Sequence, residues 1–311
     1  MGSSTCPLIN YNIGVKRKYI LVLILTFVFL LIGMGLWNIR PKEKPLVNDK
    51  RISVVTSIYP LFFFAGEVGK DKIRLTNLTP AGVEPHDYEP TAKDMIEVHK
   101  AILLILNGGN FETWGERVKG ELNAVAVVEA GRGLFTSNDS HIWLSPKLAK
   151  EEVKTILTAL SQTDPGNKNF YEENAKILIS RLDKLTADYK TGLSDCKKRE
   201  IITSHAAFGY LTQEFGLTQI PVSGLSPDEE PSTKRLTEIS KIAKDTGIKY
   251  IFFEKLVSAR LAETIADEVG AKTMVLDPIE GISDNDLSQG KNYISIMEDN
   301  LTNLRIALEC R

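Results

Sequence analysis

The chain has 311 residues, of which 25% are charged and 43% are hydrophobic, and its formal net charge is -2 at pH 7. These values are ordinary for a globular protein, and the length is sufficient for two domains. The sequence shows no basic patch and no array of aromatic and basic residues, so a nucleic-acid partner is not expected.

The first fifty residues differ from the rest. Residues 1–18 form a short tail that ends in Lys16-Arg17-Lys18, and the charge-free apolar run Tyr19–Trp37 follows. As a helix, this run is long enough to cross a hydrocarbon core of about 30 Å. Neither a small-x-small cleavage site nor a lipid-acceptor cysteine follows it, so we favour a transmembrane anchor over a long signal peptide. Residues 38–50 are polar and contain prolines, and we interpret them as a tether.

From Arg51 onward, short strand-like runs alternate with helix-like runs. The predicted strands of the first half are 52–56, 73–78, 101–106 and 124–128. The third run is apolar throughout, as in strands that are buried on both faces of a parallel sheet. This spacing predicts βαβ units, and therefore a four-stranded parallel sheet with helices on both faces.

A long helical pattern separates this half from the next. Asp164-Pro165-Gly166-Asn167 signals its start, and Leu178, Leu182 and Leu185 form one apolar stripe. A helix of about 27 residues would span roughly 40 Å, which is too long for a simple crossover. The predicted division is therefore a first lobe at 51–166, a linking helix at 167–195 and a second lobe at 196–311.

The second lobe repeats the plan of the first. Its predicted strands are 200–204, 218–222, 250–253 and 272–276. The predicted fold class is α/β: two lobes, each with a four-stranded parallel sheet flanked by helices, joined by one long helix and preceded by a single N-terminal transmembrane helix.

Side chains that can bind metal stand beyond strand ends in both lobes. His86 lies in the stiff loop Glu84–Pro90, between two prolines, and His141 lies in the loop after the fourth strand. In the second lobe, His205 follows the first strand directly and Asp277 stands at the end of the fourth. Ligands bind at the carboxyl ends of parallel strands, so two facing sheet edges would bring three imidazoles and one carboxylate together.

Three imidazoles and a carboxylate suit a four-coordinate cation, zinc above all. Glu254, which follows a strand, and Glu280, which lies near Asp277, are weaker candidates for a ligand or for a residue that supports one. The alternative is that these are unrelated polar residues at strand ends, where polar residues are common. We interpret the fourth histidine, His99, as a surface residue on a helix.

Of the three cysteines, Cys6 precedes the apolar run, and Cys196 and Cys310 lie in the body that follows. If this body is outside the cytoplasm, the latter two are free to form a disulfide. Two unrelated thiols are the alternative.

Seven stretches carry a family resemblance through their order and spacing: Ser57–Leu61, Glu84–Pro90, Asn107-Gly108, His141–Pro146, Thr203–Leu211, Ser226–Ser232 and Leu276–Gly281. With them, residues 51–311 resemble the zinc- and manganese-binding solute-binding proteins of bacterial ABC importers, the high-affinity zinc-uptake and adhesion-lipoprotein family. The resemblance implies two lobes joined by one long helix, with the metal between them. It also implies that the ligands are His86, His141, His205 and Asp277.

The implied function is capture of zinc outside the cytoplasm and its delivery to an ABC permease, without enzymatic activity. Manganese-binding members tend to have a carboxylate at the third ligand position, where this chain has His205, so zinc is favoured over manganese. The chain departs from many zinc-binding members because it lacks a His- and acid-rich loop after His86. The missing lipid-acceptor cysteine leaves membrane attachment to the Tyr19–Trp37 helix.

Three alternatives to a zinc importer protein stay open at this point. They are a manganese-binding importer protein, a surface adhesin stabilised by metal and a zinc hydrolase. The hydrolase is the least favoured, because a fourth protein ligand closes the shell and only Glu280 is available as a general base. We expect a monomer whose body lies in the periplasm or at the cell surface.

Overall fold

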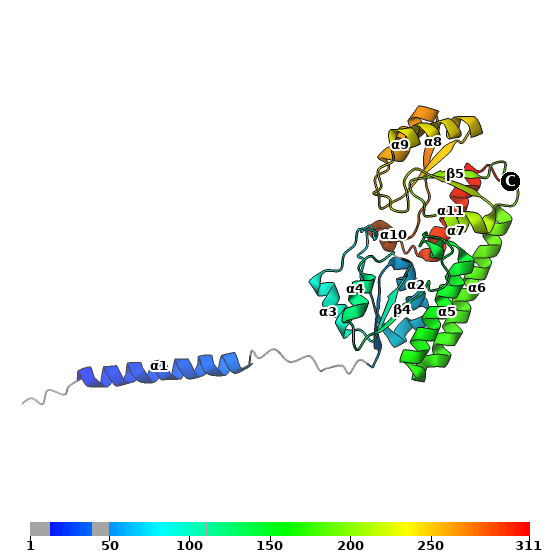
Figure 1. The fold of residues 1–311 in the computed structure, drawn as a ribbon. Coiled ribbons are helices and arrows are strands. Elements are labelled where there is room, and N and C mark those ends of the chain that lie inside the picture. Colours follow the sequence, from blue (N-terminus) through cyan, green and yellow to red (C-terminus); the bar gives the residue numbers. More distant parts are fainter. Residues whose placement is uncertain (1–12, 39–49, 110) are drawn as a thin grey trace, which may run out of the picture. The chain divides into compact units, whose positions relative to one another are not determined.

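The computed structural model describes residues 13–38, 50–109 and 111–311 (Figure 1). The chain divides into two units, one ending at Lys50 and one covering Arg51–Arg311. The described residues of the first unit are the helix α1 (Ile13–Asn38) and Lys50. Residues 1–12 of the predicted tail and residues 39–49 of the predicted tether lie outside the described residues.

The predicted membrane span over Tyr19–Trp37 is not supported. A helix does form over this segment. However, among the residues that the structure describes, no helix combines the length and the apolar character needed to cross a membrane.

The first lobe is a parallel sheet in the order β2-β1-β3-β4. Its strands are β1 (Ile52–Thr56), β2 (Ile73–Asn77), β3 (Leu103–Leu106) and β4 (Ala126–Glu129). The central residue Val54 of β1 pairs with Leu75 on one side and with Leu103 on the other. The order brings the loops after all four strands to one edge of the sheet, because the strands are parallel.

Helices cover both faces of this sheet. They are α2 (Tyr59–Gly69), α3 (Ala92–Lys100), α4 (Gly115–Glu121) and α5 (Pro146–Thr163), with short 3₁₀ turns at Lys70–Lys72 and Ile142–Leu144. Side chains of a strand alternate between the two faces. Leu103 accordingly packs in the cluster that contains α2 and α5, whereas Leu104 packs in the cluster that contains α3 and α4.

The second sheet has the corresponding order, β6-β5-β7-β8. Its strands are β5 (Glu200–Thr203), β6 (Thr218–Pro221), β7 (Tyr250–Phe253) and β8 (Lys272–Val275). Its helices are α7 (Gly209–Phe215), α8 (Thr233–Thr246), α9 (Arg260–Val269), α10 (Asp284–Ser288) and α11 (Tyr293–Ala307). The prediction of two four-stranded parallel sheets flanked by helices is confirmed.

The long helix α6 (Lys168–Gly192) lies between the two lobes in the chain, after a 3₁₀ turn at Pro165–Asn167. It packs against α5 and α2 of the first lobe and against α11 of the second (Figure 1). One buried side chain occurs every three or four residues along it, from Tyr171 to Tyr189. The largest hydrophobic core is therefore continuous through both lobes, and this continuity restricts how far they can separate.

Cys196 and Cys310 form a disulfide that joins positions 114 residues apart. The two residues also pair as an isolated antiparallel bridge, which brings the end of the chain against the segment after α6. In the chain-entropy model, closing a loop of this size stabilises the folded state by about 4–5 kcal/mol at 25 °C.

We therefore expect the double substitution Cys196→Ser and Cys310→Ser to lower the free energy of unfolding by up to about 5 kcal/mol, because the unfolded chain gains freedom. Denaturant unfolding followed by circular dichroism measures this. Cys6→Ser, which leaves the pair intact, is the control. An unchanged unfolding midpoint under non-reducing conditions would contradict the prediction.

Candidate metal centre

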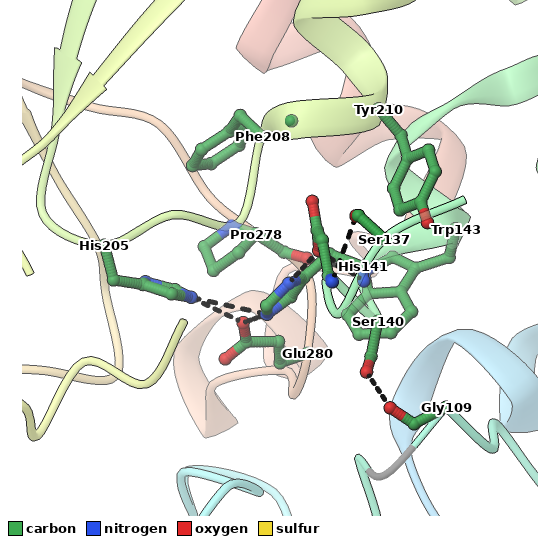
Figure 2. Close-up of polar contacts among 12 residues, drawn as sticks. Gly109, Ser137, Ser140, His141, Trp143, His205, Phe208, Tyr210, Pro278 and Glu280 are labelled. Atoms are coloured by element: carbon green, nitrogen blue, oxygen red, sulfur yellow. Dashed lines mark hydrogen bonds and ion pairs between the residues drawn. The ribbon is translucent and has the colours of Figure 1, made fainter. Parts of the chain in front are cut away.

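Three imidazoles and one carboxylate meet where the loops of the two sheets face each other. His86 follows β2, His141 follows β4, His205 follows β5 and Glu280 follows β8. One donor atom from each of the four lies within 4.8 Å of the others. Figure 2 shows His141 and His205 pointing toward the Glu280 carboxylate. The predicted convergence of three histidines is therefore present in the structure.

The spacing of the four donors matches a small tetrahedral site. The Nε2 atom of His141 lies 3.2 Å from that of His86 and 3.4 Å from that of His205. The Oε1 atom of Glu280 lies 3.5 Å, 3.0 Å and 3.1 Å from the Nε2 atoms of His86, His141 and His205. A tetrahedron with bonds of about 2.0 Å, as zinc makes to nitrogen and oxygen, has edges of about 3.3 Å. The four donors could therefore hold a zinc ion with little movement.

Two further carboxylates orient two of the imidazoles. His141 Nδ1 lies 2.7 Å from Asp139 Oδ1, and His205 Nδ1 lies 2.7 Å from Glu254 Oε1. A carboxylate oxygen accepts the hydrogen bond from each Nδ1–H, so Nε2 is the nitrogen of each ring that faces the centre. Once it has lost its proton, each Nε2 can present a lone pair to a metal. Glu254 thus contacts a donor without being one of the four. We did not predict a role for Asp139, although its position two residues before His141 was an available signal.

Asp277, which we predicted as the carboxylate ligand, is not among the four residues whose donor atoms lie within 4.8 Å of one another. Its Oδ1 atom accepts a hydrogen bond from the backbone N–H of Ile279 at 2.8 Å, and its Oδ2 atom lies 3.6 Å from Lys255 Nζ. Glu280, three residues later in the same loop, contacts the histidines instead. We had considered Glu280 only as a weaker candidate.

Burial and charge oppose each other at this centre. The side chains of His141, His205 and Glu280 are at most 3% exposed, and that of His86 is 14% exposed. Burial by itself lowers the pKa of His205, but the charge of Glu280 and hydrogen bonds to Glu254 and Glu280 outweigh it and raise that pKa to about 10. The pKa of His141 is also raised, since its bonds to Asp139 and Glu280 outweigh burial.

The same interactions act on Glu280 in the opposite sense. Burial by itself raises its pKa, but the charge of His205 and hydrogen bonds from the three histidines hold the pKa of Glu280 well below its usual range. In the metal-free protein, protonated imidazole therefore supplies the positive charge that this carboxylate requires. A bound cation would take over that role and displace protons.

Known proteins are similar to this chain over most of its length. The family model described as "Zinc-uptake complex component A periplasmic" matches residues 54–307. The high-affinity zinc uptake system protein ZnuA of Bacillus subtilis is 38% identical over 315 residues, covering 94% of this chain and 98% of that protein. The zinc-binding protein AdcA of Streptococcus pyogenes serotype M6 is 34% identical over 94% of this chain, which spans 62% of that relative.

Solved structures share the fold. The Zn(II)-bound ZnuA-like domain of Streptococcus pneumoniae AdcA matches with a TM-score of 0.76 and 38% identity, over 83% of this chain and 99% of that one. The laminin-binding protein Lmb of Streptococcus agalactiae, described as bifunctional with adhesin and metal transporting activity, matches with a TM-score of 0.77 and 32% identity over the same shares. The family resemblance predicted from the sequence is confirmed: the chain belongs to the family of zinc-uptake complex component A proteins, ZnuA.

Proposed function

We propose that this chain is a solute-binding protein that captures zinc(II) with His86, His141, His205 and Glu280 and delivers it to an ABC importer. The observation that carries the proposal is the convergence of three Nε2 atoms and one carboxylate oxygen, at separations that match the edges of a zinc tetrahedron. The names of the relatives, a high-affinity zinc uptake protein and a Zn(II)-bound domain, support it.

The donor set favours capture over catalysis. A catalytic zinc site keeps an open position for water, whereas four protein donors close the shell. Glu280, which we had considered as the general base of a hydrolase, is one of the four donors. The family is one of zinc-uptake components and not of enzymes.

The four donors are unequally shared between the lobes. Glu280 belongs to the second lobe in sequence, but three hydrogen bonds attach its loop to the first lobe: Trp143 Nε1 to Pro278 O, Tyr59 N to Glu280 O and Gly82 N to Ile282 O. His86, His141 and Glu280 thus stand on one body, and His205 stands on the other. We propose that a small movement of the second lobe withdraws His205, weakens the site and allows zinc to leave for the permease.

Other features support a location and an assembly state for this protein. A disulfide between Cys196 and Cys310 suits an oxidising compartment, and the family is described as periplasmic. We therefore place the body outside the cytoplasm. All four donors come from one chain, so a monomer is sufficient to bind zinc.

Calorimetric titration of the metal-stripped protein tests the ligand set. We expect one zinc per chain, manganese bound more weakly, and at least about a 100-fold loss of zinc affinity in Glu280→Gln, since even indirect supports of a metal site contribute 10–100-fold. His99→Ala, which removes an exposed histidine of α3, is the control. Tighter binding of manganese would favour the manganese alternative. Full zinc affinity in Glu280→Gln would refute the ligand set.

Zinc binding should release protons, because imidazoles bind metal only when neutral. With the pKa of His205 raised to about 10, that imidazole is protonated at pH 7 in the metal-free protein, and zinc must displace its proton. Apparent affinity should therefore rise at least about tenfold per pH unit between pH 6 and 8, and more steeply below about pH 6.

Titrations in two buffers of different ionisation enthalpy count the released protons. We expect at least one proton per zinc at pH 7 for the unmodified protein and fewer for His205→Ala. Equal heats in both buffers, together with an affinity that does not change from pH 5 to 8, would contradict a site built on these imidazoles.

A further inference from the structure

The residue before Glu280 has an unusual backbone conformation. Ile279 is fully buried and has a φ of 57°, in the left-handed region. This region is disfavoured for residues with a Cβ atom and especially for β-branched ones. Such a conformation persists only where its surroundings hold it, and it is common at functional sites. The contacts that hold Ile279 in this conformation therefore affect the position of Glu280.

The side chain of Asp277 contacts the backbone of Ile279. Its Oδ1 atom accepts the hydrogen bond from the N–H of Ile279 at 2.8 Å, across a two-residue turn. Asp277 is itself fixed by Asn300 of α11, a buried residue whose side chain bonds both backbone groups of Asp277. The Asp277 N–H donates to Asn300 Oδ1 at 2.9 Å, and Asn300 Nδ2 donates to the Asp277 carbonyl at 2.7 Å.

The loop is held on its other side by the first lobe. Trp143 Nε1 donates to the carbonyl of Pro278 at 2.7 Å, and the N–H of Tyr59 donates to the carbonyl of Glu280 at 3.3 Å (Figure 2 shows Trp143, Pro278 and Glu280). Ile279 lies between these two bonded carbonyls, so its φ angle contributes to the direction in which the Glu280 carboxylate points. A different φ would move that carboxylate away from the three Nε2 atoms.

We propose that Asp277 is a positioning residue and not a zinc ligand: its carboxylate oxygen holds Ile279 in the left-handed conformation and thereby aims Glu280 at the metal centre. The inference rests on the proposed zinc-binding function. In this role the Asp277 side chain must accept a hydrogen bond, but it does not need to be charged. Lys255, the cation nearest to Asp277, keeps two hydrogen bonds to Asp286 and so does not depend on Asp277 for a partner.

The test compares substitutions that separate the acceptor from the charge. Asp277→Asn keeps an Oδ1 acceptor and loses the charge, so we expect zinc affinity within about threefold of the unmodified protein. Asp277→Ala removes the acceptor, and we expect at least about a tenfold loss, comparable to other indirect supports of a metal site. Affinity is measured by competition with a zinc chelator on protein whose fold is verified by circular dichroism.

A second substitution tests the route through Ile279. Glycine adopts a positive φ without a Cβ clash, so Ile279→Gly added to Asp277→Ala should recover at least part of the lost zinc affinity. Ile279→Gly alone is the matched control for the lost side chain. Asn300→Ala, which frees the backbone of Asp277, should lower zinc affinity in the same direction as Asp277→Ala.

The zinc affinities of the two Asp277 variants distinguish the possible roles of this residue. Retained affinity in Asp277→Asn with reduced affinity in Asp277→Ala supports the positioning role. An equal large loss in both variants would make Asp277 a ligand, and no loss in either would remove any role, so both results overturn the inference. If Asp277→Ala does not fold, Asp277→Asn and Asn300→Ala still decide. A failure of the proposed function appears separately, as zinc affinity that Glu280→Gln leaves unchanged.

Discussion

Much of this protein's architecture depends on holding four donor atoms close together around one point. Three imidazole lone pairs and a carboxylate, nearly all shielded from water, repel one another unless a positive charge lies among them. In the metal-free protein, protons on the imidazoles supply that charge, and Asp139 and Glu254 hold the rings in place. The centre is therefore prepared for exchange between protons and a metal cation. Such an arrangement is suited to binding that is tight and still reversible.

The two sheets provide the geometry for this centre. The two sheets have the same strand order, β2-β1-β3-β4 and β6-β5-β7-β8. Because all strands of a sheet are parallel, the loops after them lie at one edge of that sheet. The donor loops follow β2, β4, β5 and β8. The helix α6 and the core continuous through both lobes keep the two edges facing each other. The fold thus tolerates a small relative movement of the lobes more readily than a wide opening.

The loop after β8 shows how contacts between lobes modify a ligand set. In sequence, Glu280 belongs to the second lobe, but its carbonyl and that of Pro278 accept hydrogen bonds from the first lobe. At Asp277 the same loop is bonded to Asn300 of α11, so it is attached to both lobes. In the function that we propose, His86, His141 and Glu280 stay together and His205 completes the shell.

The sequence by itself determined the fold class, the family and the three histidines. Alternating strand-like and helix-like runs reflect local periodicity, and parallel strands bring their carboxyl ends to one edge, so His86, His141 and His205 could be placed together without a structure. The order of the seven short stretches identified the family, which the family match over residues 54–307 confirms. These features depend on local pattern and on topology, and both can be predicted from the amino-acid sequence.

Only the tertiary structure decided which carboxylate joins the histidines. Asp277 and Glu280 lie three residues apart in one loop, and the choice between them depends on the φ of Ile279 and on bonds to Asn300 and Trp143, which are distant in sequence. The pairing of Glu254 with His205 likewise joins loops that follow different strands. The predicted membrane span over the N-terminal helix is not supported by the described residues. Side-chain direction in an irregular loop is set by such long-range contacts, and no local pattern encodes it.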